Sequence, residues 1–368
     1  MRILVVAVSA RMLAQLAVAD GHEVIALDRF GDVDLRAVAR VATARSNEAL
    51  AALGADVDAD AVLYGAGFEN RPDLVAKLAR GRELLGTPPE LLAEVRDPWA
   101  VGAAARSAGA RAPEIRSVDE LLAASGGRRS VADSETWLRK PRRGGGGRGV
   151  RPWAGGALRA TEIVQRRIPG LACSAVAIGD GRRAVVLGIT EQLLRRPGFR
   201  WTGNVAPPRL PERERAELED QLRAVCAEVA TRFGVRGAFG VDAVWDGRDA
   251  WVVEVNPRPP AALELFEAGS FEAHVRGARG IGVPTAGVPP AGSGARVKLV
   301  LFANRDVRAP DPDWWPAHLV RDIPRAGEMI KRGAPLCTLI SATTTVPELA
   351  ARGTHLLSAL PEAMLVRD

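Results

Sequence analysis

Residues 137–150 read WLRKPRRGGGGRGV, and this stretch decides the fold. A short apolar strand leads to Lys140, and a glycine-rich loop follows it. Glycines leave the backbone N–H groups free to close over phosphate oxygens, and a lysine adds a compact positive charge. The loop is not of the P-loop type, because its lysine precedes the glycines. The stretch predicts phosphate binding, although a flexible linker or an RGG-type RNA-binding segment has a similar composition.

A second stretch, residues 240–259, reads GVDAVWDGRDAWVVEVNPRP and predicts a β-hairpin that turns at its Asp-Gly pair. Glu254 and Asn256 are two residues apart and share a face, which Asp242 on the partner strand can join. The neighbouring valines, including Val253, are expected on the other face. Three oxygen-bearing side chains without a cation beside them in sequence suit Mg²⁺. A solvated polar face is a poor explanation, because valine and tryptophan surround them.

The first ninety residues alternate apolar runs with helical patterns, which predicts an open α/β sheet domain. Strands are expected at 3–8, 23–28 and 61–65, and helices at 10–20, 47–53 and 72–80. The first turn lacks the glycines of a dinucleotide site, so NAD is not expected. Ser9 and Arg11 follow the first strand and are candidates to hold a substrate carboxylate; solvated turn residues explain them equally well.

Composition excludes several classes of protein. The chain has 368 residues, a formal net charge of +6 and 47% hydrophobic residues, which is ordinary for a globular protein. All but four of its 50 basic residues are arginine, interspersed with acidic residues, so we expect no nucleic-acid partner. Neither a membrane span nor a signal peptide is recognisable, and the three cysteines lie far apart; we expect a cytoplasmic protein.

Glycine- and proline-rich stretches divide the chain. We expect a Rossmann-like domain at 1–96, a central domain at 97–294 that binds ATP and metal, and a small β-rich lobe at 295–368 that ends in a helix.

Lys140 with its glycine loop, followed by a strand pair ending in Glu254-Val255-Asn256-Pro257-Arg258, resembles the ATP-grasp superfamily of ATP-dependent carboxylate ligases. The resemblance covers residues 84–269. It implies a mixed α/β (α+β) fold: a Rossmann-like parallel sheet, a two-subdomain ATP-grasp unit and a small β-rich lobe.

The resemblance also implies roles for individual residues. Lys140 contacts the ATP phosphates, and Arg258 stabilises charge on the transferring phosphoryl group. The metal, Mg²⁺ or Mn²⁺, is held by Asp242, Glu254 and Asn256. The mobile lid over the phosphates is formed by Gly144, Gly145, Gly146, Gly147 and Gly149.

Adenine and ribose contacts follow from the segment that is similar to the family's hinge. There the backbone of Gln165 and Arg166 reads the adenine edge, and Ile168 packs on its face, unless Ile168 is simply a core residue. Ser174 stands where many members have a ribose-binding glutamate. The family's Asp-Lys pair is replaced by Arg96-Asp97-Pro98, which puts one phosphate contact in doubt.

Several short stretches look like a branch related to ligases of methanofuran-type cofactor assembly. Gln192, Trp201 and Asn204 are then candidate substrate contacts, with exposed loop residues as the equal alternative. The implied reaction joins a small-molecule carboxylate to an amine through an acyl phosphate, giving ADP and phosphate. The alternatives are a carboxylase-type component, a noncatalytic nucleotide-binding protein and an RGG-type RNA-binding protein. The oligomeric state stays open, with a homodimer as one option.

Overall fold

The computed structural model describes residues 1–368 except 118–119, 121–135, 154, 156, 196, 267–268, 284–294, 343 and 361–368. The glycine- and proline-rich linker predicted before residue 295 therefore lies largely outside the described residues. Within the described part of the chain, no helix is long and apolar enough to cross a membrane.

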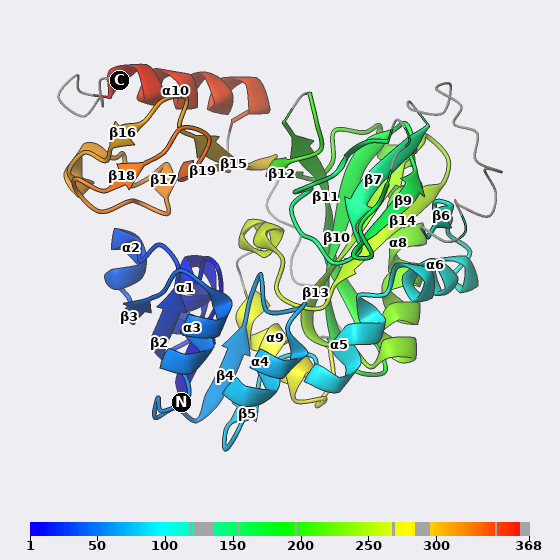
Figure 1. The fold of residues 1–368 in the computed structure, drawn as a ribbon, viewed down its shortest axis with the longest axis horizontal. Helices are drawn as coiled ribbons and strands as arrows, with labels where there is room; N and C mark the ends of the chain where they lie inside the picture. Colours follow the sequence, from blue (N-terminus) through cyan, green and yellow to red (C-terminus); the bar gives the residue numbers. More distant parts are fainter. Residues whose placement is uncertain are drawn as a thin grey trace.

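The N-terminal part folds around a five-stranded parallel sheet with the order β3-β2-β1-β4-β5 (Figure 1). Its elements are β1 (Arg2–Val6), α1 (Arg11–Ala19), β2 (Glu23–Asp28), α2 (Val33–Arg36), β3 (Arg40–Thr43), α3 (Asn47–Leu53), β4 (Ala61–Tyr64), α4 (Pro72–Leu78) and β5 (Glu83–Leu84). The α/β sheet predicted from the apolar runs is confirmed, and β3 and β5 are additional short edge strands.

Strand β1 is apolar from Ile3 to Val6 because both of its faces are covered there. Ile3 and Val5 pack with α1 and with α9 (Ser270–Ala278), whereas Leu4 and Val6 pack with α3 and α4. Helix α9 therefore fastens a late segment of the chain to the N-terminal sheet.

The central part contains an eight-stranded antiparallel sheet with the order β14-β13-β10-β11-β12-β15-β19-β17. Its first five strands and their helices are β10 (Leu171–Asp180), β11 (Ala184–Leu194), β12 (Trp201–Ala206), α8 (Glu212–Phe233), β13 (Arg236–Trp245), β14 (Ala250–Asn256) and the 3₁₀ helix η2 (Ala261–Leu265). Helix α8 supplies Leu218, Leu222 and Val225 to the core beneath this sheet.

A smaller antiparallel sheet, with the order β6-β9-β7-β8, carries the glycine loop (Figure 1). Its strands are β6 (Ile115–Arg116), β7 (Trp137–Pro141), β8 (Arg151–Pro152) and β9 (Glu162–Arg166). Two helices, α5 (Pro89–Val95) and α6 (Pro98–Ser107), lead from the N-terminal sheet to this part of the molecule. The side chain of Asp97 begins α6 by accepting hydrogen bonds from two backbone N–H groups.

The C-terminal segment continues the central sheet. Its elements are β15 (Arg296–Phe302), β16 (Val307–Arg308), η3 (Pro312–Trp314), β17 (Val320–Arg321), β18 (Met329–Ile330), β19 (Pro335–Ser341) and α10 (Val346–Ala359). Strand β15 pairs with β12, so one sheet runs across the predicted boundary at residue 295. The predicted final helix is present and begins with a capping box of Thr345 and Glu348.

The predicted hairpin is present as β13 and β14, with one correction. A β-bulge follows the Asp242–Glu254 pair, and Ala243 pairs with Val252. Val252 and Val255 are therefore the core residues of β14, while Val253 is only half-buried. Strict alternation placed Val253 on the core face, and the inserted residue makes that wrong.

Candidate active site

Lys140, near the end of β7, lies beside the two predicted carboxylates of β13 and β14. The Lys140 ammonium donates to the side-chain oxygen of Gln165 at 3.4 Å and to the carbonyl of Val253 at 3.5 Å. Burial lowers the pKa of Lys140, and the positive charge of Arg96 adds to that effect, while Glu254 opposes it. A half-buried lysine with only two long hydrogen bonds keeps donor capacity for a ligand.

The hairpin brings Asp242, Glu254 and Asn256 together, as their spacing predicts. The Asn256 amide donates to Asp242 Oδ2 at 3.0 Å and to Glu254 Oε1 at 3.3 Å, and Gln192 donates to Asp242 Oδ1 at 2.8 Å. The oxygen of the Asn256 amide accepts from Arg96 at 3.0 Å instead of facing the carboxylates. In this arrangement the two carboxylates face each other and Asn256 orients them.

Electrostatics indicate that this pair of carboxylates fits a divalent cation. Burial and the charge of Glu254 raise the pKa of Asp242. Burial also opposes ionisation of Glu254, but Arg96 and Lys140 outweigh it and lower the pKa of that carboxyl. The repulsion between two adjacent, half-buried carboxylates is relieved by a cation between them, and hard oxygen donors suit Mg²⁺. Among the described residues, no group of three or more His, Cys, Asp or Glu side chains is suited to a metal. Because Asn256 turns its NH2 group to the carboxylates and its oxygen to Arg96, the oxygen donors here are the two carboxylates, and Asn256 is not placed as the third ligand that its spacing predicts.

Arg96 is the residue whose role sequence reasoning left open, and it lies at the centre of the site. Only 6% of it is exposed. Its guanidinium donates to the Val255 carbonyl at 2.7 Å, the Gly144 carbonyl at 2.5 Å and the Asn70 side chain at 3.1 Å, besides Asn256. One side chain thus joins the N-terminal domain, the carboxylate strand and the glycine loop. In the sequence, the only sign of this role was that Arg96-Asp97-Pro98 stands where the family has its Asp-Lys pair.

Arg258 lies against the N-terminal domain. Its Nε is 3.3 Å from Glu69 Oε1, and Glu69 is only 3% exposed. Glu69 follows β4, and its other oxygen accepts the backbone N–H of Gly67 at 2.6 Å. Sequence reasoning missed Glu69, although its place just beyond the carboxyl end of a parallel strand is where ligand-binding residues of such sheets occur.

The glycine loop is docked on the turn between β11 and β12. The N–H of Trp201 donates to the Gly146 carbonyl at 3.1 Å. Gly146, Gly147 and Gly149 all have positive φ, and a Cβ at Gly147 would lie 1.8 Å from the carbonyl oxygen of Phe199. The loop therefore needs glycine for its conformation and for its close approach to the turn.

The predicted adenine segment is only partly free. Gln165 is paired with strands on both sides, and the N–H groups of Arg166 and Arg167 donate to the carbonyls of Glu114 and Thr136. The backbone N–H groups of Gln165 and Arg166 are thus committed to the sheet. We retain only Ile168, which is half-buried beyond the end of β9, as a candidate for the adenine contact.

A chain of buried polar groups joins several predicted residues. The Ser174 hydroxyl is 2.9 Å from that of Thr190, which accepts from the Asn204 amide at 2.8 Å; Asn204 in turn accepts from the Trp201 indole at 2.9 Å. Ser174, Trp201 and Asn204 therefore satisfy one another through Thr190. Of the three predicted substrate contacts on these strands, only Gln192 reaches the carboxylate pair.

The two N-terminal candidates differ from each other. Ser9 is exposed, whereas Arg11 is 1% exposed and is held by the carboxylates of Glu264 and Asp322. Lys298 also contacts Glu264, at 2.6 Å. Arg11 therefore ties the N-terminal domain to η2 and the C-terminal lobe, and in this structure its guanidinium is not free for a substrate.

Comparison with known proteins identifies the central part. Residues 97–262 match the family model described as ATP-grasp domain. These residues form an ATP-grasp domain. The match contains β7, the glycine loop, and the hairpin that carries Asp242 and Glu254.

Relatives and solved structures agree with this family. The chain is 32% identical over 82 residues to the carbamoyl phosphate synthase large chain of Halomonas eurihalina, covering 22% of this chain and 7% of that one. It is 33% identical over 87 residues to a formate-dependent phosphoribosylglycinamide formyltransferase of Burkholderia pseudomallei, covering 23% and 22%. These matches thus span less than a quarter of either relative.

The likeness to solved structures extends over nearly the whole chain. N5-carboxyaminoimidazole ribonucleotide synthetase from Thermus thermophilus superposes with a TM-score of 0.68 at 19% identity, covering 98% of this chain and 99% of that one. The biotin carboxylase domain of 2-oxoglutarate carboxylase from Hydrogenobacter thermophilus gives 0.72 at 14%, covering 97% and 89%. At such identities the shared property is the ATP-grasp fold, which confirms the fold class that the two motifs predict.

Proposed function

We propose that this protein is an ATP-dependent ligase that joins a carboxylate to an amine and releases ADP and phosphate. The convergence of Lys140 and Arg96 on the Asp242–Glu254 pair, beside the docked glycine loop, carries the proposal. Two cations favour a polyphosphate, and two half-buried carboxylates favour a divalent cation. If these charged residues served only to stabilise the fold, the glycine-rich loop beside them would have no explanation.

Lys140 and Arg96 hold the nucleotide phosphates, and the loop at 144–149 excludes water above them. Asp242 and Glu254, with Asn256 orienting them, hold Mg²⁺ or Mn²⁺, which supplies charge neutralisation of the phosphates when bound. Ile168 packs against the adenine.

The reaction proceeds in two steps. A carboxylate oxygen of the substrate attacks the γ-phosphorus, the bond from that phosphorus to the bridging oxygen breaks, and ADP leaves. An amine nitrogen then attacks the acyl carbon, phosphate leaves, and the nitrogen loses a proton. Arg258, held by Glu69, stabilises negative charge on the transferring group. Gln192 lies beside Asp242, where it can contact the acid substrate.

The Hydrogenobacter domain is described as a dimer bound to MgADP, and we propose a homodimer here too.

Hydroxylamine provides a test that does not require the natural amine. The protein is incubated with MgATP, hydroxylamine and, one at a time, the amino acids, common dicarboxylic acids and formate; ADP and hydroxamate are measured. We expect at least one acid to give both products in equal amounts. Glu254→Gln abolishes them, whereas Glu217→Gln, on the exposed face of α8, does not. ADP release from no acid, despite MgATP binding, would contradict the proposal and favour a noncatalytic nucleotide-binding protein.

A carboxylase-type reaction is the second candidate, because several of the solved structures that share the fold are carboxylases or their domains. Bicarbonate is therefore included in the same panel. ADP release with bicarbonate alone, and with none of the organic acids, would favour this second candidate over amide formation.

A further inference from the structure

Three arginines gather where the glycine loop meets the turn between β11 and β12. Arg148 belongs to the loop, and Arg195 and Arg200 flank the turn, where the N–H of Arg195 donates to the Arg200 carbonyl at 2.8 Å. The neighbouring hydrogen bond from Trp201 to Gly146 brings the loop to the same turn. Burial lowers the pKa of Arg200, and the neighbouring charges of Arg148 and Arg195 lower it further. Among the described residues, no ion pair joins any of the three to a carboxylate, although many other arginines of the chain have one.

The fold holds the side chain of Arg200 and the backbone that carries Arg148 in place. The guanidinium of Arg200 lies 4.3 Å from the ring centre of Phe302 and donates to the Gly333 carbonyl at 3.3 Å. Arg200 is thereby held against the C-terminal lobe. Arg148 follows Gly147, the residue whose backbone fits tightly against Phe199, so the docked loop carries Arg148 to the same place.

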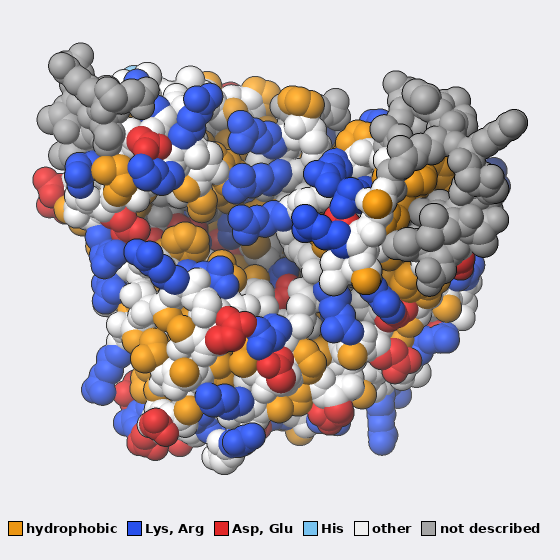
Figure 2. Space-filling model, in the orientation of Figure 1, with side chains coloured by type: hydrophobic (Ala, Val, Ile, Leu, Met, Phe, Trp, Pro, Cys, Tyr) orange, Lys and Arg blue, Asp and Glu red, His pale blue; other side chains and the backbone are white. Residues whose placement is uncertain are grey.

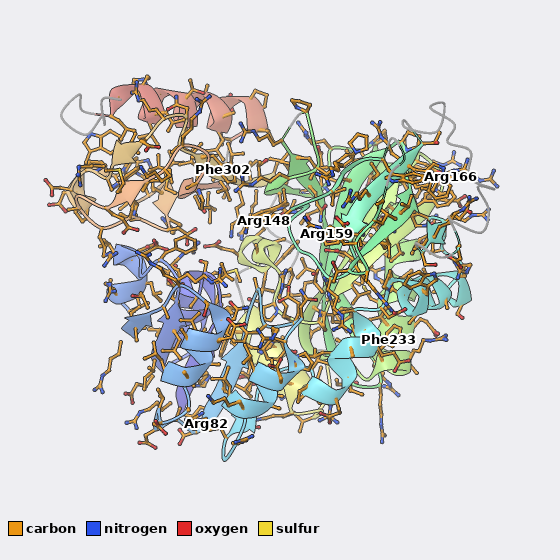
Figure 3. All side chains as sticks on the ribbon, in the orientation of Figure 1. Arg82, Arg148, Arg159, Arg166, Phe233 and Phe302 are labelled. Atoms are coloured by element: carbon orange, nitrogen blue, oxygen red, sulfur yellow. The ribbon has the colours of Figure 1, made fainter. Side chains whose placement is uncertain are left out.

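Arg148 lies near the central hollow of the molecule (Figure 2, Figure 3). Figure 2 shows Lys and Arg side chains in a column that runs down to a central hollow. In Figure 3, Arg148 lies between Phe302 of the C-terminal lobe and Arg159 of the ATP-grasp domain. Like charges that the backbone holds together, without carboxylate partners, favour an anion between them, and guanidinium groups bind phosphate and carboxylate oxygens in a fixed geometry.

We propose that Arg148, Arg195 and Arg200 bind a doubly charged anionic group, phosphate or dicarboxylate, of the second substrate, separately from the nucleotide phosphates. The inference rests on the proposed ligase function and names the chemistry of its substrate. Because Arg148 lies on the glycine loop and Arg200 lies on the turn between β11 and β12, an anion that contacts both also holds the loop closed. Binding of the second substrate thus favours exclusion of water from the site.

Inorganic phosphate is the probe, and calorimetry is the measurement. The protein is first saturated with the magnesium complex of the non-hydrolysable ATP analogue AMP-PNP, which occupies the γ-phosphate position, and phosphate is then titrated. We expect phosphate to bind the wild type and to bind Arg200→Gln and Arg195→Gln at least tenfold more weakly. The matched control is Arg183→Gln: this arginine is exposed and precedes the start of β11, whereas Arg195 follows its end.

The outcomes distinguish an anion of the second substrate from the phosphates of the nucleotide. Unchanged nucleotide affinity with weakened phosphate binding supports the proposal. Weakened nucleotide affinity in Arg195→Gln and Arg200→Gln would assign the cluster to the nucleotide and overturn it, as would phosphate binding that is equal in all variants or absent. Arg200→Gln also removes the contact with Phe302, so a loss of binding in that variant alone could be structural. Arg195→Gln leaves that contact intact and therefore tests the charge by itself. Failure of the analogue itself to bind would instead contradict the ligase function, and the phosphate titration repeated without nucleotide still tests the cluster.

Discussion

The docked glycine loop gives a graded prediction at three neighbouring positions. At Gly145 an added Cβ would have no neighbour within 4 Å, and the backbone has no positive φ, whereas Gly146 has a φ of +59° but open space. Gly147 combines a φ of +69° with a Cβ position 1.8 Å from the Phe199 carbonyl oxygen. Alanine at these three positions therefore separates backbone strain from steric exclusion within a single loop.

The expected energies follow from these contacts. A left-handed backbone costs alanine about 1–2 kcal/mol, which applies at Gly146 and Gly147. At Gly147 the loop must also move by roughly 1 Å to escape the clash, since Cβ contacts under about 3 Å are essentially not found. That movement weakens the hydrogen bond from Trp201 to Gly146, which is worth about 1 kcal/mol. The total of about 2–3 kcal/mol shifts loop opening roughly 30- to 150-fold.

Trypsin reports loop opening directly, because Arg143 and Arg148 are exposed within the loop. Cleavage of a transiently open segment follows its open population when closing is fast. We expect Gly145→Ala to be cleaved at the wild-type rate, Gly146→Ala about tenfold faster and Gly147→Ala fastest, as measured from the fragments that end at Arg143 and Arg148. Equal rates for Gly146→Ala and Gly147→Ala would refute the docked position of the loop against Phe199.

Three further predictions concern single charged residues. Arg96→Lys keeps the charge but cannot reach all four acceptors, and we expect MgATP affinity measured by calorimetry to fall about tenfold, or ~1.4 kcal/mol; unchanged affinity contradicts the role of Arg96. Arg11→Leu leaves Asp322 without this cation and Glu264 with Lys298 alone, and should lower the free energy of unfolding in urea by about 3–5 kcal/mol; a folded variant of normal stability contradicts its structural role. Burial and the nearby charges of Asp322, Asp28 and Asp34 raise the pKa of Asp32 to about 9. Because the folded state then holds a proton that the unfolded state has lost, stability falls as pH rises from about 4 to 9. Asp32→Asn removes this dependence, so its stability relative to wild type should increase by about 4 kcal/mol between pH 5 and pH 8 in urea titrations, and a constant difference contradicts the shift.

Local sequence patterns predicted much of the fold because apolar runs and alternating apolar residues show which side chains are buried. The apolar run at residues 3–8 needed two covered faces, and the structure provides them. The hairpin with Asp242 and Glu254 followed from alternation and an Asp-Gly turn. The bulge that moves Val253 off the core face carries no such pattern, since it arises from pairing between strands.

The parts of the site that sequence did not predict depend on contacts between distant segments. Arg96 meets Gly144 and Asn256 across 48 and 160 residues, and Glu69 meets Arg258 across 189. Arg11 looked like a ligand-binding residue because it follows a parallel strand. Only the packing of Glu264 and Asp322 against it explains its presence there.

Calorimetric titration of ATP, with and without Mg²⁺, on wild type and Lys140→Met tests the central claim most directly. Methionine keeps the aliphatic part of the side chain and removes the ammonium that lies beside Glu254. The account predicts magnesium-dependent binding that weakens at least tenfold in the variant. An absence of binding at millimolar ATP, or equal binding by both proteins, would contradict a nucleotide site at Lys140.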